Sequence, residues 1–339
     1  MDQHEITREI PLLNADGELT EPGYAKKLLP VYRRADIKAS PMRIKEWDYY
    51  LISNDRFALA LTIADNGYMG LISASVLDFE KPWEQTTSVM TAFPMGKYKL
   101  PETSAAGVTS YTDSRVNMRF EAANGVRRIS CVFHKFLRDE TLEAELTLTD
   151  EPQHSMVIAT PFEKPKAFYY NQKINCMRAN GFMRLGGETY DFSKEDSFAT
   201  LDWGRGVWTY DNTWYWGNGN GTVNGHRVGF NIGYGFGDTS AASENMIIYD
   251  GTAHKLSKVN FNIPADSYIK PWTFTSDDGR FEMDFVPVID RAARTNALII
   301  ESDQHQVFGR FTGKMVLDGG EIIELKDFMG FAEKVHNRY

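Results

Sequence analysis

Cysteine is scarce in this 339-residue chain, which contains only Cys131 and Cys176. The two residues lie far apart, with no CxxC spacing and no nearby histidine pair, so neither a disulfide framework nor a zinc site is indicated. We expect both to be buried thiols, because free cysteine behaves as a small apolar side chain. The seven histidines form no HxH or HExxH pattern, so we predict no bound metal and no cofactor.

Clusters of basic residues and long apolar stretches are also missing. The chain has 37 Lys and Arg against 46 Asp and Glu, which gives a formal net charge of -9. Because binding to a phosphate backbone needs clustered cations, nucleic acid is not an expected partner. The N-terminus has no apolar signal-peptide core and no stretch of about 18 apolar residues occurs, so we predict a cytoplasmic protein without a transmembrane segment.

Long helical periodicity is rare, and alternation of apolar and polar residues replaces it from about Trp47 onward. It is clearest in residues 57–64, 115–121, 142–149 and 281–285. Turn pairs such as Asn124-Gly125, Asn224-Gly225 and Asp250-Gly251 fall between these segments and supply the positive φ of tight hairpins. The pattern predicts an all-β protein of antiparallel strands, with one short interrupted helix between Glu21 and Ala35.

The number of expected strands exceeds what one small barrel uses, so we predict two consecutive barrel-like halves or strongly curved sheets. The least periodic region is residues 151–166, where three prolines interrupt the pattern. We place the boundary near Lys164, with an N-terminal domain of residues 1–164, including the short helical segment, and a C-terminal domain of residues 165–339. No internal repeat supports this division, which depends on strand number and length.

The segment from Leu201 to Gly221, LDWGRGVWTYDNTWYWGNGNG, has five glycines and four tryptophans in twenty-one residues. Glycine allows another group to approach the main chain closely, and tryptophan supplies a broad apolar face with one donor. Together they indicate a lined opening for a ligand. The predicted ligand-binding side chains are Trp203, Arg205, Trp208, Trp214, Trp216, Asn231, Tyr234 and Trp272.

Asp202 is the principal catalytic candidate. Between Leu201 and Trp203 its carboxyl group would be desolvated, which raises the pKa and allows it to act as a proton donor. Alternatively, Asp202 caps the turn at Gly204 to Gly206 or pairs with Arg205. The tryptophans at 214 and 216 share one strand face while Tyr215 faces the other, and core packing alone would also explain them.

Two further residues complete the candidate site. Glu244 precedes an apolar strand and could form a carboxylate pair with Asp202, or it could be an ordinary surface charge. His226 follows an Asn-Gly turn and could act as a base, or it could be a solvated turn histidine. The nearby Gly233, Gly235 and Gly237 form GxGxG without a following helix, which is the wrong context for a dinucleotide fold.

The order of motifs indicates a family. KINCMRANGFMRLGG is followed by LDWGRGVW, WYWGNGNG, VGFNIGYGFGD, SENMIIYDG, PWTFTSDDGRFEMDFVP and FGRFTGKMVLDGG. This succession resembles the bacterial family designated domain of unknown function 2804, from about Glu9 to Glu333. More distantly the chain resembles the tandem lipocalin-like group that includes hydroxyneurosporene synthase, a carotenoid hydratase.

The resemblance implies two consecutive lipocalin-like barrels with ligand space inside or between them. In the hydroxyneurosporene synthase group, a D-x-N-W-G loop contributes a catalytic acid. The corresponding run here, Asp202-Trp203-Gly204, is shorter and lacks the Asn and the neighbouring His.

Three functions follow as hypotheses. The first is an enzyme that binds a hydrophobic or polycyclic small molecule and performs lyase, hydratase or isomerase chemistry, with Asp202 as general acid and aromatic rings stabilising a developing cation. The second is a non-catalytic carrier of a lipid or metabolite. The third is a carbohydrate-active enzyme that uses Asp202 and Glu244. The sequence leaves the oligomeric state open.

Overall fold

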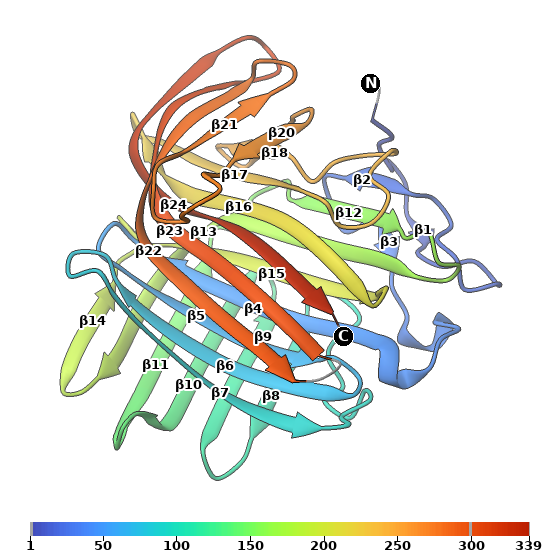
Figure 1. Cartoon of the computed structure of the whole chain (residues 1–339), viewed down its shortest axis with the longest axis horizontal. Coiled ribbons are helices and arrows are strands. Elements are labelled where there is room, and N and C mark those ends of the chain that lie inside the picture. Colours follow the sequence, from blue (N-terminus) through green and yellow to red (C-terminus); the bar gives the residue numbers. More distant parts are fainter. Residues whose placement is uncertain (1–2, 298–299, 339) are drawn as a thin grey trace.

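The molecule consists almost entirely of antiparallel strands in two large, strongly curved sheets (Figure 1). The computed structural model describes residues 3–297 and 300–338. The all-β prediction is confirmed, and the two curled sheets agree with two lipocalin-like barrels. No helix in the described residues has the length and apolarity needed to cross a membrane.

The first sheet has thirteen strands, with a main path β7-β6-β5-β4-β15-β13-β11-β10-β9-β8; β12 and β14 also pair with β13, and β2 pairs with β12. Its strands are β2 (Gly23–Ala25), β4 (Ile44–Ser53), β5 (Phe57–Asp65), β6 (Met69–Asp78), β7 (Trp83–Ala92), β8 (Gly107–Thr112), β9 (Val116–Ala123), β10 (Val126–Leu137), β11 (Glu140–Thr149), β12 (Met156–Pro161), β13 (Phe168–Leu185), β14 (Glu188–Phe192) and β15 (Phe198–Val207). The sheet curls until β7 meets β10, where the Thr87 hydroxyl donates to the Phe136 carbonyl at 2.6 Å.

The second sheet has nine strands in the order β19-β18-β17-β16-β24-β23-β22-β21-β20. They are β16 (Asp211–Val223), β17 (His226–Tyr234), β18 (Met246–Tyr249), β19 (Thr252–Lys255), β20 (Val259–Asn262), β21 (Trp272–Ser276), β22 (Phe281–Ala297), β23 (Ile300–Val316) and β24 (Ile322–Arg338). The long strands β22 to β24 cross over β4 to β6 (Figure 1), and Phe79 stacks on Phe308 with centroids 5.6 Å apart.

The predicted hairpins form where the sequence places their turns. Asn124-Gly125 joins β9 to β10, and the two residues have φ of 53° and 72°. Asn224-Gly225 joins β16 to β17 with φ of 53° and 86°. Both turns therefore use the positive φ that Asn and Gly tolerate. Both cysteines are buried, as expected, and burial raises the pKa of each thiol to about 12.

The helix expected between Glu21 and Ala35 is wrong. This segment contains β2, then β3 (Pro30–Val31), which pairs with β1 (Ile10–Pro11), and its only helical turn is the start of the 3₁₀ helix η1 (Arg34–Asp36). A second 3₁₀ helix, η2 (Pro41–Arg43), precedes β4. Pro30 has no amide hydrogen to donate and biases the preceding residue toward extended backbone, which explains why a continuous helix does not form.

Each sheet encloses its own apolar core, and a third layer lies where the two sheets face each other. Phe133, Leu142 and Trp203 belong to the first core, whereas Phe230 and Phe285 belong to the second. The chain passes from the first sheet to the second between Val207 and Asp211. That the chain divides near Lys164 into two separately folding domains stays a prediction.

Candidate active site

The tryptophan-rich segment begins in strand β15 and continues through β16, and β15, which holds Trp203, is buried over its whole length. Because side chains alternate along a strand, Leu201 and Trp203 point into the first core, while Asp202 faces the second sheet. Gly204 shares the face of Asp202 and pairs in register with Trp47 on β4. A Cβ atom at Gly204 would overlap the Trp47 indole, so glycine is what allows that ring to lie over the strand.

Asp202 is held by two side chains of β13. The Lys173 Nζ lies 2.9 Å from Asp202 Oδ2, and the Asn171 amide donates to Asp202 Oδ1 at 2.6 Å. Lys173 is the direct cross-strand neighbour of Asp202 in the antiparallel ladder. Asp202 therefore lies within a strand and not in a turn, and its charged partner is Lys173 and not Arg205.

A second carboxyl group, Glu333 on β24, approaches from the opposite sheet. The Trp214 indole donates to Glu333 Oε1 at 3.0 Å, and the Gln306 amide donates to Oε2 at 2.8 Å. Burial raises the pKa of Glu333, while these two hydrogen bonds and the positive charge of Lys173 act in the opposite direction. Lys173 of the first sheet also lies over the Trp216 ring of the second sheet, so charged groups of both sheets lie in the layer between them.

The third carboxyl group is Glu244, in the loop between β17 and β18. Burial raises its pKa to about 7; the charges of Lys173 and Lys255 oppose this shift, and the charges of Asp202 and Glu333 add to it. No side chain among the described residues donates a hydrogen bond to this carboxyl group. A pKa raised toward neutral pH allows Glu244 both to give and to take a proton.

Aromatic rings line the carboxyl cluster. The Lys173 ammonium lies 3.7 Å from the centroid of the Trp216 ring, and the Trp216 indole donates to Asn231 Oδ1 at 2.7 Å. Tyr49 packs edge-on against Trp216, with centroids 6.1 Å apart. Burial raises the pKa of Tyr49 to about 12, so its hydroxyl stays protonated and can donate a hydrogen bond.

The cluster is almost completely buried. Tyr49, Asp202, Trp216, Glu244 and Glu333 each keep an exposed fraction between 6% and 9%, while Asn171 and Asn231 beneath them are fully buried. The Asn171 Oδ1 atom is buried without a hydrogen-bond partner. A buried acceptor of this kind is costly unless something donates to it, so it is suited to a ligand hydroxyl.

Trp208 and Trp214 extend the aromatic lining away from the carboxyl groups. Trp208 packs edge-on against Trp47 at 5.2 Å, Trp214 at 5.9 Å and Phe236 at 4.7 Å, measured between centroids. Of the predicted ligand-binding residues, Trp208, Trp214, Trp216 and Asn231 therefore lie together in the layer between the sheets.

Trp203 and Arg205 lie on the other face of β15, inside the first sheet. The Arg205 guanidinium lies 3.0 Å from Asp48 Oδ1, donates to the Pro101 carbonyl at 2.8 Å, and sits 4.1 Å from the Trp203 ring centroid. Arg205 is completely buried, and protein groups occupy both of its terminal nitrogens. Its contacts bind the first core together.

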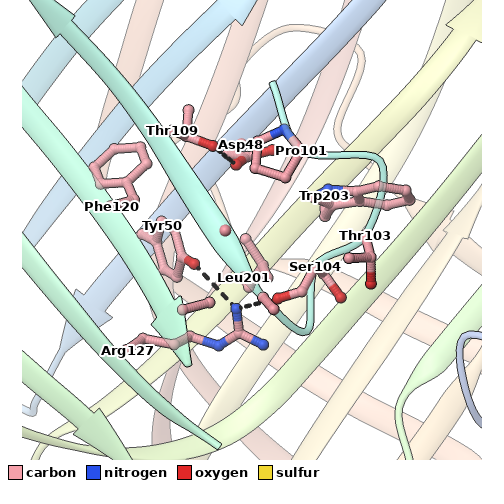
Figure 2. A pocket seen from close by; sticks show the side chains of 13 residues that line it. Asp48, Tyr50, Pro101, Thr103, Ser104, Thr109, Phe120, Arg127, Leu201 and Trp203 are labelled. Carbon is pink, nitrogen blue, oxygen red and sulfur yellow. Dashed lines mark hydrogen bonds between the residues drawn. The ribbon is translucent and has the colours of Figure 1, made fainter. Parts of the chain in front are cut away.

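A small pocket adjoins Trp203 and Asp48 in this core (Figure 2). Arg127 reaches across it and donates to the Ser104 carbonyl at 2.7 Å and to the Tyr50 hydroxyl at 3.3 Å (Figure 2). The cavity volume is about 10 Å³, which is room for about one water molecule. This pocket is therefore too small for an organic ligand.

The remaining predicted residues lie elsewhere. His226 is exposed and pairs with Asp250, with its Nδ1 2.7 Å from Oδ2. Trp272 is fully buried in the second core and donates to the Tyr268 carbonyl at 2.9 Å. Tyr234 stacks on Tyr215 at 4.4 Å and lines a polar cavity of about 330 Å³ in the second half of the chain.

Residues 3–339 match the family model described as Domain of unknown function (DUF2804). The chain belongs to this family. Among solved structures, this DUF2804 protein is similar to a Nitrosomonas europaea protein assigned as AttH, at 12% identity and a TM-score of 0.51, over 86% of this chain and 92% of that chain. No relative is found among curated proteins.

Two further structures show weaker likeness. Kievitone hydratase from Nectria haematococca is 10% identical, with a TM-score of 0.47, over 97% of this chain and 98% of that chain. CghA with Sch210972 is 10% identical, with a TM-score of 0.48, over 96% and 97% of the two chains.

Sequence reasoning found Asp202 and Glu244 in this DUF2804 protein but missed Lys173, Glu333, Tyr49 and Tyr169. Tyr169 has a pKa far above 10, through burial first and then the charge of Glu244. One signal was available, since Asn171, Lys173 and Asn175 are spaced by two along a segment in which only Gln172 among the intervening residues is polar. Polar residues spaced by two in a buried strand indicate a polar face shared with another layer.

Proposed function

We propose that this DUF2804 protein binds a hydrophobic or polycyclic small molecule in the layer between the two sheets and catalyses proton-transfer chemistry on it, of the lyase, hydratase or isomerase type. The observation that carries the proposal is that Lys173, which pairs directly with Asp202, also acts through its charge on two further buried carboxyl groups, Glu244 and Glu333. Ionisable groups with shifted pKa values in a largely dry site are typical of acid and base catalysis.

Glu244 is the better proton donor of the group. Its pKa of about 7 leaves it partly protonated at neutral pH, and its carboxyl group is not engaged in an ion pair. Asp202 accepts hydrogen bonds on both oxygens and pairs with Lys173, so the acid role that the sequence assigned to Asp202 passes to Glu244. Asp202 then supplies negative charge that helps keep the Glu244 proton in place.

The other residues in and around the carboxyl cluster orient the substrate and receive protons. Glu333 lies in the same cluster and can accept a proton from a substrate carbon or from an attacking water. The faces of Trp214 and Trp216 offer apolar contact and attract positive charge that develops during protonation. The free Asn171 Oδ1 can accept a hydrogen bond from a substrate hydroxyl.

Native mass spectrometry of the purified protein, followed by chemical analysis of any released molecule, tests the proposal. The released molecule, incubated with wild-type protein, is expected to change, and Glu244→Gln is expected to abolish that change while it retains binding. Glu324→Gln is the matched control, because Glu324 is exposed on the same strand as Glu333. Equal conversion by wild type and Glu244→Gln would rule out this role for Glu244.

Two outcomes would support other functions. A released molecule that stays unchanged with every variant identifies a carrier, in which the carboxyl cluster only binds. An oligosaccharide as the retained ligand would favour glycosidic chemistry with Asp202 and Glu244 as the two carboxyl groups.

A further inference from the structure

Three large apolar side chains are exposed at one end of the first sheet, where β4 begins and β7 ends (Figure 1, right side). Met42 is 45% exposed, Phe93 is 51% exposed and Met95 is 38% exposed. They come from two loops that contact a third: the amides of Phe93 and Met95 donate to the carbonyls of Tyr68 and Gly67. A Cβ atom at Gly67 would overlap the Met42 carbonyl, so the three loops lie side by side, and we call Met42, Phe93 and Met95 the apolar tip.

The apolar tip is held rigidly. Asp65 is completely buried, and its Oδ1 accepts from the Gly67 amide at 2.9 Å while its Oδ2 accepts from the Gly96 amide at 2.6 Å. The buried Asp65 carboxylate thus holds the loop at Gly67 against the loop at Gly96. Phe93 and Met95 have φ of 52° and 47°, backbone that ordinary side chains rarely adopt. The fold retains strained backbone here, and the result is that two apolar side chains point into solvent.

Cations surround the apolar tip in a protein whose overall charge is -9. Lys97 and Lys99 are exposed, and the Lys97 ammonium lies 3.5 Å from the Phe93 carbonyl. Arg43 follows Met42 and donates to the Trp208 carbonyl at 2.6 Å. Two acidic side chains nearby are buried and engaged: Asp65 binds the loop amides, and Glu46 pairs with Arg34.

We propose that the apolar tip docks the protein on an anionic lipid bilayer, with Met42, Phe93 and Met95 inserted among the lipid chains and Lys97 and Lys99 at the headgroups. Apolar side chains at loop tips with flanking lysines match the layered polarity of a membrane surface. In this arrangement the lysines offset the repulsion between an acidic protein and an anionic lipid surface.

The apolar tip also leads toward the candidate active site. Arg43 binds the Trp208 carbonyl, the Trp208 ring packs against Trp214, and the Trp214 indole binds Glu333. Docking would bring this aromatic series next to a source of apolar molecules. That last step depends on the proposed function, whereas docking itself does not.

Vesicle co-sedimentation of the full chain tests the proposal. Vesicles of phosphatidylcholine with phosphatidylglycerol are expected to bind the wild type, and Phe93→Asn/Met95→Asn is expected to weaken binding about tenfold or more. Asparagine tolerates positive φ, so this variant should keep the loop conformation. Ile322→Asn is the matched control, because Ile322 is 58% exposed on the second sheet. This variant should bind the vesicles as the wild type does.

A second variant separates the charges from the apolar contacts. Lys97→Gln/Lys99→Gln should lose about tenfold or more on anionic vesicles and change little on phosphatidylcholine alone. Absence of wild-type binding, or binding that neither double variant weakens, would overturn the proposal. Self-association that Phe93→Asn/Met95→Asn abolishes, without vesicle binding, would overturn it in favour of a second copy of the chain.

Discussion

At the scale of single residues, ionisable groups lie where water is almost excluded, and only some of the buried carboxyl groups have a directly paired cation. Lys173 lies against Asp202 and over the Trp216 ring, so one cation serves one carboxylate directly. Glu244 has no direct ion-pair partner among the described residues, and burial favours its protonated form although the charges of Lys173 and Lys255 oppose this. Burial of a carboxyl group without a direct cationic partner thus raises its pKa toward neutral pH.

The raised pKa of Glu244 has a consequence for stability. The pKa of Glu244 is about 7 in the folded protein against an ordinary value of 4.5, so the folded state binds the proton more tightly than the unfolded state between these values. The free energy of unfolding should therefore fall as the pH rises from about 4.5 to about 7, by a contribution of about 3 kcal/mol.

Glu244→Gln should remove this contribution, since glutamine does not ionise. Chemical denaturation at several pH values is expected to show the variant gaining stability over wild type as the pH rises through that window. Glu324→Gln, at an exposed site, should follow the wild-type curve. A constant difference between Glu244→Gln and wild type at every pH would contradict the assignment.

At the scale of strands, the sequence predicts an element well when only one of its faces is buried. In β9, Val116, Met118 and Phe120 are buried while Asn117 and Arg119 are exposed, and the alternation predicted this arrangement. In β15 all ten residues are buried, so alternation cannot show that Asp202 faces the second sheet and Trp203 the first core. Lys173 and Glu333 were missed for the same physical reason, because both lie in strands packed on two sides.

Strand β15 also depends on glycine at one place. Gly204 faces Trp47 across the ladder, and a methyl group there would occupy the space of the indole. Gly204→Ala should therefore cost about 3 kcal/mol or more in the free energy of unfolding, because an overpacked core must shift its backbone or its ring. Denaturation measurements would show the loss.

The control for this substitution is Gly319→Ala. A Cβ atom at Gly319 would have no heavy atom within 4 Å, so the change should be nearly neutral. Equal stability of Gly204→Ala and Gly319→Ala would mean that Trp47 moves aside without cost.

At the scale of the whole molecule, the two sheets share a buried layer that neither can fill alone. Trp47 and Tyr49 of the first sheet pack with Trp214 and Trp216 of the second. Separated, each sheet would expose these rings together with charges such as Asp202 and Glu333. The candidate active site is therefore also the contact on which the association of the halves depends.

Two fragments test how the chain divides. A fragment of residues 1–164 lacks β13 and β15, which lie between β4 and β11 in the first sheet, whereas a fragment of residues 1–207 keeps all thirteen strands. We expect residues 1–164 to stay unfolded, because the three groups of first-sheet strands in this fragment, β4 to β7, β8 to β11 and the β2–β12 pair, would have no pairing between them. Residues 1–207 should form β-structure but bind hydrophobic dye, because the face toward the second sheet is uncovered. Circular dichroism and dye fluorescence distinguish these outcomes, and a cooperatively folded fragment of residues 1–164 would instead support a domain boundary near Lys164.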